Sequence, residues 1–95
     1  MPLYVITFMD KPGVLEKRLA ARERHLAYLD AQAPAYKLGG PFLDAQGGMI
    51  GSMLVVEAED LAAAQALADN DPYKAAGLFD NCDVRPWRHV YGKLP

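Results

Sequence analysis

Residues 3–9 have the sequence LYVITFM, a run that decides the fold because it is apolar on both of its faces. The run is rich in β-branched and aromatic side chains and ends at the turn sequence Asp10-Lys11-Pro12-Gly13, which predicts a β-strand. Each face of this strand carries three bulky apolar side chains: Leu3, Val5 and Met9 on one, and Tyr4, Ile6 and Phe8 on the other. Both faces of the strand therefore have to be covered.

The rest of the chain supplies two helices, a short helical turn and three more strands. The expected elements are a helix over 14–32, strands over 35–41 and 49–57, a helix from Asp60 to about residue 69, a helical turn from Asp71 to Gly77, and a strand over 82–91 near a sheet edge. Gly39-Gly40-Pro41 is interpreted as the turn that ends the second strand. The order βαββαβ predicts an α+β, ferredoxin-like fold with a four-stranded antiparallel sheet.

Two helices cover only one face of such a sheet. The apolar second face of the first strand then stays open to water, and a large exposed apolar patch usually marks an interface. In a chain this small, the expected cover is a second copy of the same chain. The sequence therefore predicts a homodimer.

Length, charge and cysteine content narrow the class of protein. The 95 residues predict one domain over 1–95, and a hydrophobic fraction of 52% supports a packed core. A net charge of −2 provides no basic excess for nucleic acid, and no segment has the length of a membrane span. A single cysteine, Cys82, and the absence of signal-peptide features at the N-terminus favour a soluble cytoplasmic protein.

The helix over 14–32 carries an arginine and a histidine where a core helix would be apolar. At about 100° per residue, four leucines form one stripe of this helix: Leu15, Leu19, Leu26 and Leu29. Arg22 falls in the middle of the stripe, and Arg18 and His25 lie on its shoulder. Either Arg22 snorkels or pairs with a carboxylate, or Arg22 and His25 line a cleft between helix and sheet, with Arg22 as an anion clamp.

His25 and Asp71 each have a structural and a functional interpretation. His25 is either a hydrogen-bonded structural residue or a proton-transfer group, since histidine titrates near neutral pH. Asp71 precedes Pro72 and is explained by helix capping alone. Both roles of Asp71 can coexist, because one carboxylate oxygen can cap the helix while the other orients an imidazole. No metal-ligand spacing or phosphate-binding glycine loop occurs, so no cofactor is expected.

Five segments together closely resemble the YciI-like family, also called YCII-related proteins. They are LYVI (3–6), LEKRLAARERHLAYL (15–29), GGP (39–41), ADNDPYKAAGLFD (68–80) and VRPWRHVY (84–91). The resemblance implies a ferredoxin-like subunit that dimerises through its sheet, similar to dimeric α/β-barrel proteins. It also implies an active-site pair of His25 and Asp71, with Arg22 and Ser52 as further, substrate-binding candidates in the cleft.

The resemblance leaves the reaction open, because most members of the family have no assigned activity. One related branch removes HCl from a chlorinated hydroxyhydroquinone, and no motif places this chain in that branch. We expect a cofactor-independent lyase or isomerase that uses a His–Asp dyad on a small anionic molecule. The alternatives are a non-catalytic module that binds or carries a small molecule, and a domain that serves only assembly.

Overall fold

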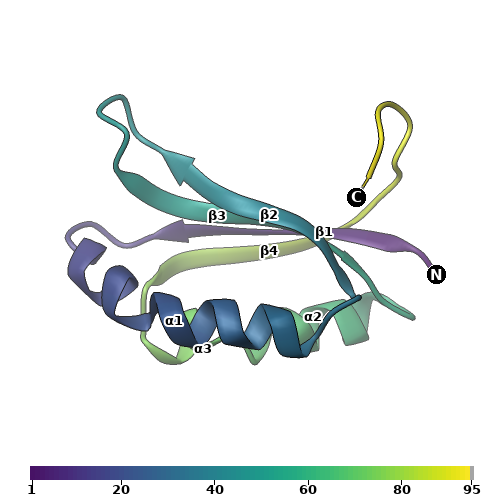
Figure 1. The fold of residues 1–95 in the computed structure, drawn as a ribbon, viewed down its shortest axis with the longest axis horizontal. Coiled ribbons are helices and arrows are strands. Elements are labelled where there is room, and N and C mark those ends of the chain that lie inside the picture. Colours follow the sequence, from purple (N-terminus) through teal and green to yellow (C-terminus); the bar gives the residue numbers. More distant parts are fainter. Residues whose placement is uncertain (95) are drawn as a thin grey trace.

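The computed structural model describes residues 1–94, so Pro95, the end of the expected domain, lies outside the described residues. In chain order the elements are β1 (Leu3–Asp10), α1 (Leu15–Ala31), β2 (Tyr36–Leu43), β3 (Met49–Glu57), α2 (Leu61–Asp69), α3 (Pro72–Ala75) and β4 (Phe79–Trp87). The four strands form one antiparallel sheet, and the helices lie on one side of it (Figure 1). The predicted α+β class and element order are confirmed. Within residues 1–94, no helix is both long enough and apolar enough to cross a bilayer.

The strand order β2-β3-β1-β4 places β1 inside the sheet, between β3 and β4. β4 lies at the sheet edge, as predicted, but it runs from Phe79 to Trp87 rather than over 82–91. The ends of β4 are set by its register with β1. Leu3 at the start of β1 pairs with Trp87, so residues 88–94 extend beyond the end of β1, while Phe79 pairs with Asp10 at the other end.

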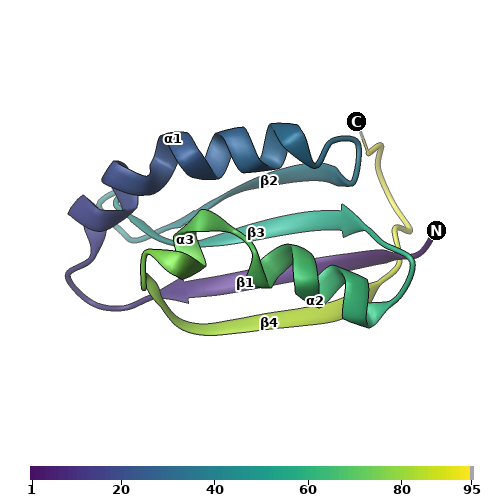
Figure 2. The ribbon, with the colours of Figure 1, turned by 90° about the horizontal axis from the view of Figure 1, so that it is seen from below.

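The core fills the space between the sheet and the helices. Tyr4, Ile6 and Phe8 of β1 are buried on this side, together with alanines of α2 such as Ala64 and Ala68. Small side chains let α2 approach β1 and β4 closely, whereas α1 lies over the β2–β3 half of the sheet and packs against α3 (Figure 2). The two halves of the helical layer therefore differ in how closely they contact the sheet.

The leucine stripe of α1 does not face the core. Leu15, Leu19 and Leu26 are 45%, 52% and 44% exposed, and only Leu29 packs against the core. The buried face of α1 is instead formed by Arg18, Ala21 and His25, about 100° away around the helix axis. Burial of the two polar residues is tolerated because each has a buried partner, described below.

No helix of residues 1–94 lies on the opposite face of the sheet (Figure 1). A shallow groove crosses it, lined mainly by apolar side chains: Val5, Leu38, Met53, Val55, Pro86 and Trp87, with Arg85 beside them. Register places Val5 and Val55 opposite each other on this face. The second apolar face expected from the sequence is therefore present.

Candidate active site

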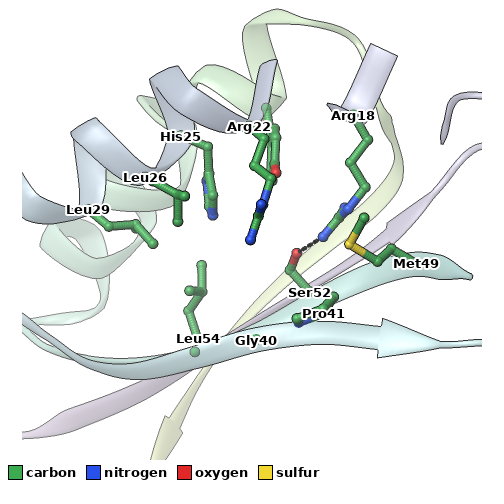
Figure 3. A pocket seen from close by; sticks show the side chains of 12 residues that line it. Arg18, Arg22, His25, Leu26, Leu29, Gly40, Pro41, Met49, Ser52 and Leu54 are labelled. Atoms are coloured by element: carbon green, nitrogen blue, oxygen red, sulfur yellow. Dashed lines mark hydrogen bonds between the residues drawn. The ribbon is translucent and has the colours of Figure 1, made fainter. Parts of the chain in front are cut away.

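A cleft lies between α1 and the β2–β3 half of the sheet, with a volume of about 190 Å3 (Figure 3). Its lining combines cationic and polar groups with apolar walls: Arg18, Arg22, His25, Leu26 and Leu29 of α1, Gly39, Gly40 and Pro41 of β2, Met49, Ser52 and Leu54 of β3, and Tyr73 of α3. Helix and sheet thus each supply polar groups to the same cleft. Among residues 1–94, no group of three or more His, Cys, Asp or Glu side chains is placed to hold a metal ion.

The floor of the cleft includes Gly39, Gly40 and Pro41, which belong to β2 and do not form the turn that the sequence predicted. Pro41 pairs with Ser52 across the ladder, and proline is tolerated there because β2 is an edge strand. A Cβ atom on Gly39 would approach the Leu54 side chain to 2.3 Å. The bare backbone at Gly39 therefore leaves room that a side chain would take from the cleft.

His25, in the middle of α1, is hydrogen-bonded to Asp71, which precedes α3. The Nδ1 atom lies 2.9 Å from both carboxylate oxygens of Asp71, and both residues are buried. A carboxylate only accepts hydrogen bonds, so Nδ1 donates and the proton of the neutral imidazole resides there. The Nε2 atom is then an acceptor, and the ring nitrogen of His25 is directed into the cleft (Figure 3).

Asp71 and Tyr73 fix the position of the imidazole. Asp71 caps α3, accepting the backbone N–H of Tyr73 at 2.9 Å, with Pro72 in the first turn of the helix. The Tyr73 ring stacks on the His25 ring with centroids 3.9 Å apart and planes inclined by 10°. One short helix thus provides both the carboxylate and the aromatic surface that orient His25.

Arg18 is the most heavily bonded side chain of the site, and the sequence analysis did not select it. It is 2% exposed; its Nη1 atom donates to both Asp10 oxygens at 3.1 and 2.9 Å. Its Nη2 atom donates to the Gly51 carbonyl at 2.9 Å and to Ser52 Oγ at 2.5 Å. Burial raises the pKa of the Asp10 carboxyl, and the Arg18 guanidinium opposes part of that effect. The charge of Arg18 is therefore balanced within the protein.

Arg22 has a different environment from Arg18. It is exposed at the mouth of the cleft, and its guanidinium points inward between His25 and Ser52 (Figure 3). Among residues 1–94 it forms no salt bridge, unlike Arg18 with Asp10. Arg22 thus supplies a positive charge to the cleft that no carboxylate of residues 1–94 pairs with.

The structure brings the four predicted site residues to one place. His25, Arg22 and Ser52 line the cleft, and Asp71 lies directly behind His25. Their roles remain predictions. The sequence analysis missed Arg18, Asp10 and Tyr73. One signal for Arg18 was present, because it lies seven residues before His25 and so on the same face of the helix.

A comparison with protein-family models matches residues 2–88 of the chain to the YCII-related domain. The chain belongs to the YCII-related family. Among relatives of this YCII-related protein, Protein YciI of Escherichia coli is 42% identical and the match covers 94% of this chain and 99% of the relative. An uncharacterised protein of Haemophilus influenzae is 38% identical, with 93% and 98% of the two chains covered.

Comparison with solved structures supports the same family assignment. One is the 5-chloro-2-hydroxyhydroquinone dehydrochlorinase of Burkholderia phenoliruptrix in complex with 2,5-dihydroxybenzoquinone. It is 36% identical with a TM-score of 0.86, and the match covers 93% of this chain and 95% of the dehydrochlorinase. An antibiotic biosynthesis monooxygenase is 14% identical, with a TM-score of 0.56 and 96% and 100% of the chains covered. The second likeness concerns the fold alone.

Proposed function

We propose that this YCII-related protein is a cofactor-independent enzyme of the lyase or isomerase type that moves a proton on a small anionic substrate. The observation that carries the proposal is the imidazole of His25, whose Nδ1 is bound by Asp71 and whose other nitrogen points into the cleft. An imidazole that is held in one tautomer, with its second nitrogen open to a cleft, is suited to general acid–base catalysis.

The proposed chemistry is a proton transfer through His25. Nε2 removes a proton from an acidic O–H or C–H bond of the substrate, and the buried Asp71 carboxylate stabilises the imidazolium that forms. The same nitrogen then returns the proton to another atom of the substrate. In an elimination of HCl, the substrate loses a proton and chloride leaves with the electrons of its bond to carbon.

The lining of the cleft supports a small, oxygenated ring as substrate. An apolar cavity of roughly 150 Å3 holds a benzene molecule, so a cleft of about 190 Å3 has room for one ring with its oxygen substituents. Leucine side chains line its walls, and the unneutralised guanidinium of Arg22 would attract a phenolate or enolate. The quinone bound to the Burkholderia dehydrochlorinase is consistent with this class, and dehydrochlorinase-like chemistry is the specific form we propose to test.

Hydrogen exchange in a ring substrate tests the proposal directly. We expect the protein to accelerate replacement of the ring hydrogens of 2,5-dihydroxybenzoquinone by deuterium in D2O, followed by NMR, and to release chloride from 5-chloro-2-hydroxyhydroquinone. His25→Gln, which lacks the proton-transfer group, should show only the rate of the buffer. Binding of the quinone by the wild type without any exchange or chloride release would contradict the enzyme and favour the alternative, a binding or carrier module.

We also propose that the protein is a homodimer joined through the open face of its sheet. Val55 is only 3% exposed there although no helix of residues 1–94 covers this face, and its neighbours Val5 and Met53 are also apolar. Such a patch is stabilised when a second copy removes it from water. A location in the cytoplasm, supported by the lone unpaired thiol of Cys82, belongs to the same proposal.

Charge placed on the open face is expected to separate the two subunits. Met53→Glu puts a carboxylate in the groove on this face, so light scattering after size exclusion should show the mass of one chain instead of two. Lys17→Glu on the exposed surface of α1 is the control and should leave the mass unchanged. A wild-type protein with the mass of one chain at all concentrations would contradict the dimer.

A further inference from the structure

Ser52 is the serine of β3 that faces the cleft, and its hydroxyl is bonded to a buried cation. The residue is 3% exposed, and its Oγ atom receives a hydrogen bond from Nη2 of Arg18 (Figure 3). Arginine has five N–H donors and no acceptor. Ser52 Oγ is therefore the acceptor in this contact, and the hydroxyl hydrogen must be directed elsewhere.

Among residues 1–94, the Ser52 hydroxyl has no acceptor for its hydrogen. The carbonyl of Gly51, its nearest neighbour in the chain, already accepts from Arg18 at 2.9 Å. Since Ser52 lines the cleft, the remaining donor capacity of Oγ is available to a molecule bound there. Buried hydroxyl groups normally use their donor, so this one indicates an acceptor on the ligand.

Arg18 cannot turn to release Ser52. Two hydrogen bonds to Asp10 and one to Gly51 fix the guanidinium plane, and its Cζ atom lies 4.8 Å from the centroid of the Tyr73 ring. Its positive charge also polarises the hydroxyl group that it contacts, which strengthens a hydrogen bond donated by that hydroxyl. The buried ion pair thus sets both the direction and the strength of the Ser52 donor.

We propose that Ser52 donates a hydrogen bond to an acceptor oxygen of the substrate, and that Arg18 is the positioning residue that fixes this donation. The inference rests on the proposed function, since it concerns the same cleft. The site then has two groups of fixed and opposite polarity. Nε2 of His25 accepts a proton, Ser52 donates one hydrogen bond, and Arg22 adds positive charge between them (Figure 3).

This polarity defines the chemical class of the substrate. The molecule must present an acidic hydrogen to His25 and a carbonyl or deprotonated oxygen to Ser52, as hydroxyquinones and other enolised hydroxycarbonyl compounds do. Negative charge that builds up on that oxygen during proton removal would be stabilised by the hydroxyl and by Arg22. Compounds without an acceptor oxygen should bind weakly, because they would leave the buried Ser52 donor unpaired.

Titration with 2,5-dihydroxybenzoquinone tests the donor. Ser52→Ala is expected to weaken binding of this probe by about 10- to 100-fold, the loss of one hydrogen bond to a charged oxygen. Thr7→Val is the matched control, because it removes the hydroxyl of the neighbouring strand on the opposite face of the sheet and should bind as the wild type does. Equal affinity of Ser52→Ala and wild type, or no binding by the wild type at millimolar probe, would overturn the inference.

A double-mutant cycle tests the role of Arg18. In the background Asp10→Leu with Arg18→Met, which removes the ion pair as a unit, the serine hydroxyl is free to turn toward other acceptors. In this background, Ser52→Ala should weaken binding of the quinone by less than about 3-fold. The effects of losing the ion pair and of losing the hydroxyl are then strongly non-additive. The same loss in both backgrounds would show that Arg18 does not position the hydroxyl.

The two proposals fail in different ways. If the quinone binds in a way that depends on Ser52 but its hydrogens do not exchange, the hydrogen bond from Ser52 is supported and the proposed enzyme is refuted. If exchange depends on His25 but neither exchange nor binding depends on Ser52, the proposed enzyme is supported and the hydrogen bond from Ser52 is refuted. Comparing affinity with exchange rate in the same set of variants separates these outcomes.

Discussion

Asp71→Asn is expected to slow proton transfer in the cleft by about 10²- to 10⁴-fold while leaving the fold intact. The asparagine amide can donate to Nδ1, which would move the imidazole proton to Nε2, the nitrogen that must accept. The variant also removes the negative charge that stabilises the imidazolium. Capping of α3 survives, because the amide oxygen can still accept the N–H of Tyr73.

The rate of ring-hydrogen exchange in 2,5-dihydroxybenzoquinone measures this effect, with thermal denaturation as a check on folding. Asp69→Asn is the matched control: the same change two residues earlier affects a carboxylate that is 44% exposed and bonded to Lys74 rather than to His25. The control should retain the wild-type rate. An Asp71→Asn rate within twofold of the wild type would show that the aspartate serves only as a helix cap.

Arg18→Met is expected to lower the free energy of unfolding by about 3–5 kcal/mol. Both members of the Arg18–Asp10 pair are almost fully buried, with side chains 3% and 4% exposed. Removing the guanidinium leaves the Asp10 carboxylate without its partner in a site that water scarcely reaches, and the full cost of desolvating that charge is then uncompensated. Since small domains are stabilised by only about 5–15 kcal/mol, many molecules of the variant should be unfolded near physiological temperature.

Chemical denaturation with urea measures this loss, and two variants serve as controls. Arg22→Met makes the same substitution one turn later at an exposed position and should change stability by no more than about 0.5 kcal/mol. Asp10→Leu combined with Arg18→Met removes both charges and should recover most of the stability. A loss below about 1 kcal/mol for Arg18→Met alone would contradict the structural role of the ion pair.

The order of the elements was predictable because its signals are local. The apolar run of β1, the turn sequence at residues 10–13 and the start of a helix at Asp60 each depend on residues close together in the chain. Errors occurred at strand ends. The end of β4 is set by where β1 begins, and the Gly39–Pro41 segment continues β2 because β3 pairs with it. The residues at the end of a strand do not show where the neighbouring strand begins or ends, so these ends could not be predicted from them.

The candidate site was predictable in part. The prediction included four of its residues: His25, Arg22, Ser52 and Asp71, the last two with help from a family resemblance. Arg18 was noted beside the leucine stripe but was not predicted to belong to the site. The stripe of four leucines in α1 drew attention away from Arg18 and His25 on its shoulder, although these two residues lie on the buried face. In the folded chain the polar residues are inside, since Asp10, Ser52 and Asp71 meet them there.

The sequence by itself determined the order of the elements, a first strand that is apolar on both faces, and a histidine on the first long helix. The tertiary structure alone decided which side of α1 is buried and which groups meet in the cleft. The physical reason is the cost of burying charge. A buried arginine or histidine is stable only beside a partner, and the partner of His25 lies 46 residues away along the chain.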